Sequence, residues 1–167
     1  AHWPSVVALR RAARWKSPNE KFTIVAIGAG GKGGDDARNC ASENIVAVCD
    51  VDANVLAAAA TTWPKARQYR DYRVMLEKEK SLDAVTIGIP DHHHAPAAML
   101  AIKSGRHVYC QKPLTHTIAE ARKVKAACLA SKATTKASIQ DSRTSYARAT
   151  TELLLTGAIG PIREVHI

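Results

Sequence analysis

The chain has 167 residues and carries a formal net charge of +9, with 24 Lys and Arg against 15 Asp and Glu. Its 46% hydrophobic residues exclude a disordered chain, and no apolar run reaches the roughly 18 to 20 residues needed to cross a bilayer. The length is that of one globular domain with a sizeable core.

The positive charge is concentrated at the two ends of the chain. Residues 1–21 carry five bases and one acid, residues 22–111 carry ten of each, and residues 112–167 carry nine bases and four acids. No aromatic residues alternate with these bases as they do in single-strand binders. We therefore interpret the charge as solvated surface and treat nucleic-acid binding as a minor alternative.

Short β-branched runs alternate with Ala-rich helical stretches from residue 22 onward. Strands separated by helices of this length predict right-handed crossovers and a doubly wound, mostly parallel α/β sheet. In chain order, the predicted strands are 22–28, 44–50, 68–69, 83–89, 107–110, 134–139 and 162–167, and the predicted helices are 31–41, 53–62, 71–80, 95–104, 117–131 and 142–156.

A glycine-rich loop follows the first predicted strand. Gly28, Gly30 and Gly33 form a G-x-G-x-x-G that also contains Gly31 and Lys32. Between a strand and a helix, these glycines permit a tight turn, a close approach to a pyrophosphate and close helix–strand packing. The loop predicts a dinucleotide site, whereas a P-loop is excluded because Gly33 stands where Ser or Thr is required.

Asp50 ends the second predicted strand, where a carboxylate can accept hydrogen bonds from an adenosine ribose. Val51 and Asp52 follow, with no adjacent Lys or Arg to hold a 2′-phosphate, so the pattern favours NAD over NADP. A methyltransferase, which also pairs a glycine loop with an acidic strand end, stays open on these two features alone.

Two further segments follow predicted strands. The first, 90–94, contains three histidines and an aspartate, but contiguous residues point in diverging directions and no second ligand cluster is spaced for a metal, so we expect a cofactor-lining loop and no metal site. The second is Gln111-Lys112-Pro113, where Lys112 at a strand end could polarise a carbonyl oxygen. The ordinary alternative is an exposed surface lysine.

Taken together, these motifs resemble the N-terminal domain of the Gfo/Idh/MocA oxidoreductases, over residues 20–167. The stretches HVYCQKPLTHTIAEARKV (107–124) and GAIGPIREVHI (157–167) resemble a planctomycete-type bacterial branch with a Q-K-P motif. The resemblance implies a Rossmann-like NAD(P)-binding domain, a sugar or polyol substrate and hydride transfer. It implies that Lys112 is catalytic and that the cofactor contacts Gly28, Gly30, Gly31, Lys32, Gly33, Asp50, Pro90, His94, Gln111, Lys112 and Pro113.

Two departures from the family pattern stand out. Gln111 replaces a common Glu and loses its charge, and the chain stops at Ile167, where the family continues into a C-terminal α/β substrate domain. We therefore expect a basic tail at 1–20, the dinucleotide domain at 21–160 and the first strand of a truncated domain at 161–167. Such a fragment would bind NAD with little turnover.

Other interpretations remain at this stage. A stand-alone nucleotide-binding or assembly module, which self-associates and catalyses nothing, is the main alternative to the enzyme. We expect no membrane partner and a cytoplasmic location, although the ambiguous N-terminus leaves an exported form open.

Overall fold

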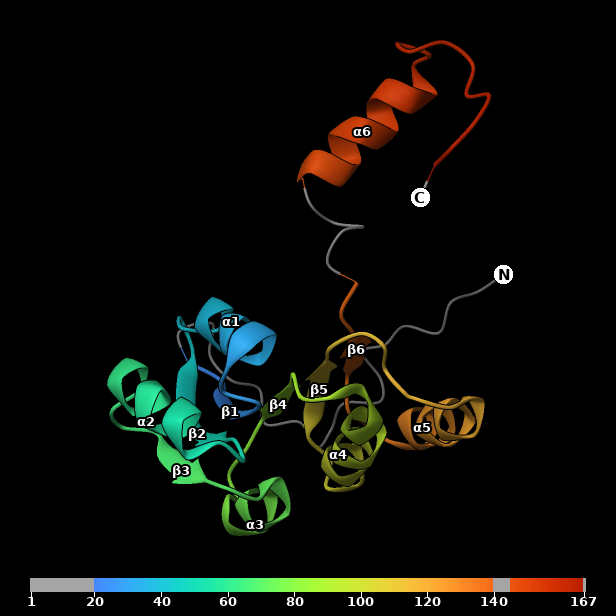
Figure 1. The fold of residues 1–167 in the computed structure, drawn as a ribbon. Helices are drawn as coiled ribbons and strands as arrows, with labels where there is room; N and C mark the ends of the chain where they lie inside the picture. Colours follow the sequence, from blue (N-terminus) through green and yellow to red (C-terminus); the bar gives the residue numbers. More distant parts are fainter. Residues whose placement is uncertain (1–19, 140–144, 167) are drawn as a thin grey trace.

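The computed structural model describes residues 20–139 and 145–166, and it contains one six-stranded parallel sheet. The strand order is β3-β2-β1-β4-β5-β6, in which the direction of the crossovers reverses between β1 and β4 (Figure 1). The strands are β1 Thr23–Ile27, β2 Asn44–Cys49, β3 Arg67–Tyr69, β4 Ala84–Ile87, β5 His107–Cys110 and β6 Thr135–Ala137.

Six helices accompany the sheet in the described part of the chain. Five of them connect consecutive strands, as the alternating pattern predicts. The helices are α1 Gly31–Asn39, α2 Ala53–Thr62, α3 Tyr72–Lys78, α4 Asp91–Lys103, α5 Ile118–Ala130 and α6 Ser145–Leu155.

Each face of the sheet has its own apolar core. Helices α1 and α2 cover one face, where Ala37 and Leu56 pack with Ala26 and Val48 of the strands. Helices α3, α4 and α5 cover the other face, which carries the larger core (Figure 1). Both faces of the central strands are thus buried, which is why these strands are continuous apolar runs.

Side-chain caps begin three of the helices. The Asp52 and Asp71 carboxylates accept backbone N–H groups at the starts of α2 and α3. Thr117 and Glu120 form a reciprocal capping box at the start of α5. The caps fix where each helix leaves its loop, and so where each strand-end residue lies.

The structure differs from the sequence prediction at α4. This helix begins at Asp91, not at Ala95, so the three histidines lie in its first turn. Pro90 occupies the N-cap with extended backbone, and Pro96 lies within the helix. An early proline removes only one helical hydrogen bond, so it does not force the helix to begin beside it.

The C-terminal end of the described chain also differs from the prediction. Residues 162–166, predicted as a half-exposed strand, form no strand, because they lie away from the sheet (Figure 1) and have no neighbouring strand to pair with. The predicted helix over 142–156 is observed as α6, although its first predicted residues, 142–144, lie outside the described residues. Most of the predicted tail, residues 1–19, lies outside them too.

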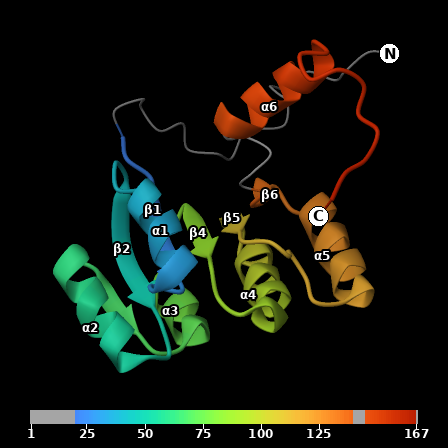
Figure 2. The ribbon, with the colours of Figure 1, turned by 45° about the horizontal axis from the view of Figure 1, so that its top comes forward.

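Helix α6 stands apart from the sheet in both views (Figure 2), and none of its residues is buried. Its large apolar side chains include Leu153 and Leu155, which are exposed. Across residues 20–139 and 145–166, no helix combines the length and the apolar character that crossing a membrane requires.

Candidate dinucleotide site at the carboxyl edge of the sheet

A cavity of about 470 Å³ opens where β1, β2 and β4 end. This is the point at which the strand order reverses, where open α/β sheets bind their ligands. Among the residues that line it are Gly28 after β1, Asp50 after β2, Gly88 after β4, and Pro90. Three of the predicted cofactor residues, Gly28, Asp50 and Pro90, therefore share one cavity.

Backbone atoms make the closest contacts at the junction between the glycine loop and the end of β4. Gly28 has a φ of 92°, and a Cβ there would lie 2.1 Å from the Gly88 carbonyl oxygen. A Cβ on Gly33 would lie 2.6 Å from the carbonyl oxygens of both Gly28 and Gly88. Gly33 thus permits close packing of helix and strand, as predicted, and Gly88 is a partner that the motif alone does not reveal.

The N-terminus of α1 faces the same edge without a side-chain cap. Gly30 is the N-cap residue and offers no side-chain hydrogen bond, and no acidic residue occupies the first turn. The N–H groups from Gly31 to Gly33 have no helical carbonyl to bond, so this terminus suits an anion such as a pyrophosphate. The Lys32 ammonium, exposed nearby, is hydrogen-bonded to Asp36 at 2.8 Å.

Asp50 is linked to the glycine loop through its carboxylate. One carboxylate oxygen accepts the Ala29 N–H at 3.0 Å, and the other accepts the Asp52 N–H at 3.1 Å. Each carboxylate oxygen retains lone-pair capacity for a ribose hydroxyl. The residue predicted to contact the ribose therefore also holds the first turn of the glycine loop.

Residues after β3 add to the cavity and were missed in the sequence. The Arg70 guanidinium donates to the Val51 carbonyl at 2.9 Å, while Asp71, Tyr72 and Arg73 also line the cavity. Hydrogen bonds from Arg73 lower the pKa of Asp71 to about 2, so this carboxylate is ionised at neutral pH. No basic residue directly follows Asp50 in the sequence, but the pairing of β2 with β3 brings Arg70 next to Val51, the residue after Asp50.

The histidines of α4 divide into two exposed residues and one buried residue. His92 and His93 line the cavity, with ring centroids 4.6 Å apart. His94 is 1% exposed, and its Nδ1 lies 2.6 Å from the Pro113 carbonyl oxygen. Because that oxygen can only accept, Nδ1 carries a proton and donates it, while Nε2 is buried without a partner in the described part of the chain.

The segment after β5 is joined to this edge by side-chain contacts. Gln111 is buried at 4% exposure and donates to the Asp36 carboxylate, whereas Lys112 is exposed. The Lys112–Pro113 peptide bond is cis. Among residues 20–139 and 145–166, no group of three or more His, Cys, Asp or Glu side chains is arranged to hold a metal ion.

This strand order and glycine loop define the chain as a dinucleotide-binding Rossmann domain. The model of the "Oxidoreductase family, NAD-binding Rossmann fold" matches residues 22–138. The chain belongs to that family, the Gfo/Idh/MocA oxidoreductases, which confirms the predicted fold class and the NAD-binding assignment.

Two curated relatives illustrate the similarity. A D-apiose dehydrogenase of Paraburkholderia graminis is 40% identical over 91 residues, which are 54% of this chain and 24% of that protein. An inositol 2-dehydrogenase of Salmonella paratyphi B is 32% identical over 103 residues, 59% of this chain and 30% of that one. The matches thus span less than a third of either relative's length.

Solved structures share the fold. The myo-inositol 2-dehydrogenase of Lactobacillus plantarum has a TM-score of 0.77 at 24% identity, covering 86% of this chain and 43% of its own. A scyllo-inositol dehydrogenase of Lactobacillus casei, solved with NAD(H) and scyllo-inositol, has a TM-score of 0.74 at 21% identity, with 86% and 43% coverage.

Proposed function

We propose that the chain is the cofactor-binding part of an NAD-dependent dehydrogenase that acts on a hydroxyl group of a sugar or polyol. The observation that carries the proposal is that Gly28, the first residue of the glycine loop, and Asp50 line one cavity, and that the Asp50 carboxylate accepts the N–H of Ala29 in that loop, two residues before α1 begins. The sugar and inositol dehydrogenases among the relatives support the substrate class.

The residues present fit a dinucleotide. The loop has no side chain at Gly30 or Gly31, and a Cβ on Gly31 would meet no protein atom within 4 Å, so its backbone is open to the close approach of a pyrophosphate. The uncapped N-terminus of α1 would stabilise its charge, and Asp50 would accept hydrogen bonds from the ribose hydroxyls. Pro90, which lines the cavity, would border the nicotinamide half, whereas the buried His94 would act only by holding the Pro113 carbonyl.

When bound, NAD supplies the acceptor for a hydride from the carbon that carries the substrate hydroxyl. Lys112, exposed at the end of β5, is the candidate catalytic residue: its Nζ would hydrogen-bond the substrate oxygen and stabilise the negative charge that develops there while the hydroxyl proton passes to water. The hydrogen bond from His94 to the Pro113 carbonyl would orient that segment.

Calorimetric titration of the 167-residue chain with NADH tests the proposal. We expect saturable binding by the native chain and a loss of about tenfold or more in Asp50→Asn, since a lost charge-assisted hydrogen bond is worth about 1.5–3 kcal/mol. Asp52→Asn is the matched control, because Asn also caps a helix and the Asp52 backbone N–H remains. Equal affinity in all three proteins, or no binding by the native chain, would refute the assignment.

The same titration with NADPH tests the preference for NAD. Arg70 is the basic side chain beside Val51, and it is held by the Val51 carbonyl. If that hydrogen bond keeps its guanidinium away from the ribose, NADPH binds more weakly than NADH, because Asp50 repels a 2′-phosphate. Stronger binding of NADPH would assign Arg70 to that phosphate instead.

A further inference from the structure

Two buried polar side chains that lie 75 positions apart in the sequence meet between α1 and the end of β5. Asp36 on α1 is 6% exposed, and Gln111 directly after β5 is 4% exposed. The Gln111 amide nitrogen donates a hydrogen bond to one oxygen of the Asp36 carboxylate. Buried carboxylates are costly unless they are paired, so the close approach of these two groups requires an explanation.

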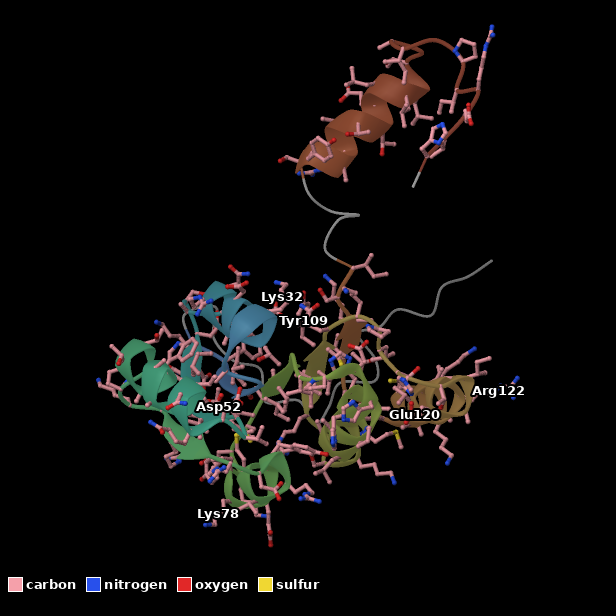
Figure 3. The ribbon with its side chains drawn as sticks, in the orientation of Figure 1. Lys32, Asp52, Lys78, Tyr109, Glu120 and Arg122 are labelled. Atoms are coloured by element: carbon pink, nitrogen blue, oxygen red, sulfur yellow. The ribbon has the colours of Figure 1, made fainter. Side chains whose placement is uncertain are left out.

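The geometry of the two elements brings these groups together. Tyr109 and Gln111 are two residues apart in extended chain and so face the same side of the sheet, the side that α1 covers. Lys32 and Asp36 are four residues apart and share one face of that helix. Figure 3 shows Lys32 of α1 beside Tyr109 of β5, in agreement with the electrostatic contact between them.

A hydrogen-bond network surrounds the Asp36–Gln111 pair. The other Asp36 oxygen accepts from the Lys32 ammonium at 2.8 Å. The Ser138 hydroxyl oxygen lies 3.4 Å from the Gln111 amide nitrogen and accepts the Tyr109 hydroxyl at 2.7 Å. This network extends from Lys32 in the first turn of α1, beside the predicted phosphate site, to Gln111, the residue that precedes Lys112.

The chemistry of an amide explains why Asp36 matters in this chain. A glutamine side chain can turn over and exchange its NH₂ and carbonyl ends, whereas an ionised carboxylate only accepts hydrogen bonds. A carboxylate at position 36 therefore selects the orientation in which the Gln111 NH₂ faces α1. A carboxylate at position 111 would instead place two negative charges against each other.

We infer that Asp36 is a positioning residue, which fixes the orientation of the Gln111 amide and thereby the placement of the adjacent Lys112 relative to the cofactor. The effect on the cofactor rests on the proposed function of this edge. Asp36 contacts neither the substrate nor the reacting atoms; it acts through Gln111.

An exchange of the two groups provides the test. Asp36→Asn leaves an amide facing an amide, and Gln111→Glu leaves a carboxylate facing a carboxylate, while the double variant restores one of each in reversed order. We expect each single variant to weaken NADH binding about tenfold and the double variant to return within about threefold of the native chain, the size of coupling typical of residues in contact. Asp35→Asn, on the exposed side of the same helix turn, is the matched control and keeps native affinity.

Thermal unfolding midpoints of the same proteins separate positioning from simple stabilisation. If the single variants have lower unfolding midpoints but the folded proteins keep native NADH affinity, the pair is only structural and the inference is overturned. Additive losses of affinity in the double variant would overturn it as well. If the native chain binds no NADH, the proposed function fails instead. The unfolding midpoints then test whether Asp36 and Gln111 are paired: a midpoint restored in the double variant supports the pairing, and additive losses refute it.

Discussion

The carboxylate of Asp50 accepts the backbone N–H of Ala29 at 3.0 Å, and so ties the end of β2 to the loop that follows β1. Its second oxygen accepts the Asp52 N–H at 3.1 Å. This carboxylate is thus engaged with two backbone donors before any ligand is considered.

Asp50→Ala should therefore destabilise the chain even without a cofactor. Loss of both acceptors leaves two backbone donors unpaired, and we expect the free energy of unfolding to fall by about 1–3 kcal/mol. Asp50→Asn keeps one acceptor oxygen and should lie between the native chain and the alanine variant. Urea unfolding monitored by circular dichroism measures both variants. An unfolding midpoint of Asp50→Ala equal to the native one would show that the two hydrogen bonds to the Asp50 carboxylate do not stabilise the fold.

Gly33→Ala should disrupt the packing of α1 on β4. Its new methyl group would lie 2.6 Å from two carbonyl oxygens that belong to backbone, so the helix must move away at a cost of about 1–3 kcal/mol. Gly31→Ala is the comparison, because its φ of 46° brings only conformational strain of about 1 kcal/mol and its Cβ would enter open space. Equal losses in the two variants, measured by urea unfolding, would show that packing at Gly33 is not tight.

Glu79 should make the stability of the β3 edge dependent on acid. Its buried carboxylate accepts from both nitrogens of the Arg67 fork and from the Tyr69 hydroxyl at 2.7 Å. The hydrogen bonds from Arg67 lower its pKa from the ordinary value of 4.5. As the pH falls, the Glu79 carboxylate is protonated in the unfolded chain before it is protonated in the folded one. Its contribution to the free energy of unfolding is therefore complete above pH 4.5 and is lost as the pH falls through the folded-state pKa.

Glu79→Gln provides the measurement of this acid dependence. We expect it to lower the free energy of unfolding by about 1–3 kcal/mol near neutral pH, with the difference from the native chain narrowing in urea titrations below about pH 4. A difference that stays constant into the acid range would refute the linkage.

His94→Ala should weaken the attachment of the Lys112–Pro113 segment to α4. The substitution empties a buried site and removes the hydrogen bond to the Pro113 carbonyl, with an expected loss of about 2–4 kcal/mol. His92→Ala, exposed on the same turn, should change stability by less than about 0.5 kcal/mol. The backbone amide chemical shifts of Leu114 and Thr115 report the segment directly, and unchanged shifts in His94→Ala would contradict the attachment.

Element order and the dinucleotide loop could be predicted from the sequence because both depend on local signals. Apolar runs that end in glycine or aspartate identify β1 and β2. The last predicted strand, 162–167, failed over residues 162–166 because an alternating pattern forms a strand only where another strand is available to pair with it.

Contacts that depend on the assembled sheet could not be predicted in the same way. Arg70 reaches Val51 only because β3 pairs with β2, and Gln111 meets Asp36 only because α1 packs against β1 and β4, next to the end of β5. The short β3 was itself predicted, so treating its end like the other strand ends would have identified Arg70. No spacing rule connects positions 36 and 111.

The contact of Gly28 and Gly33 with Gly88 has a consequence for how such a domain can diversify. At these contacts backbone touches backbone, so no side chain can be exchanged to adjust the affinity for the cofactor. The three glycine positions at the centre of the site therefore cannot vary gradually under selection. Variation in cofactor preference is therefore confined to the rim, where Asp50 and Arg70 carry side chains that can change. A mutational library over this edge should accordingly show an invariant centre surrounded by a permissive border.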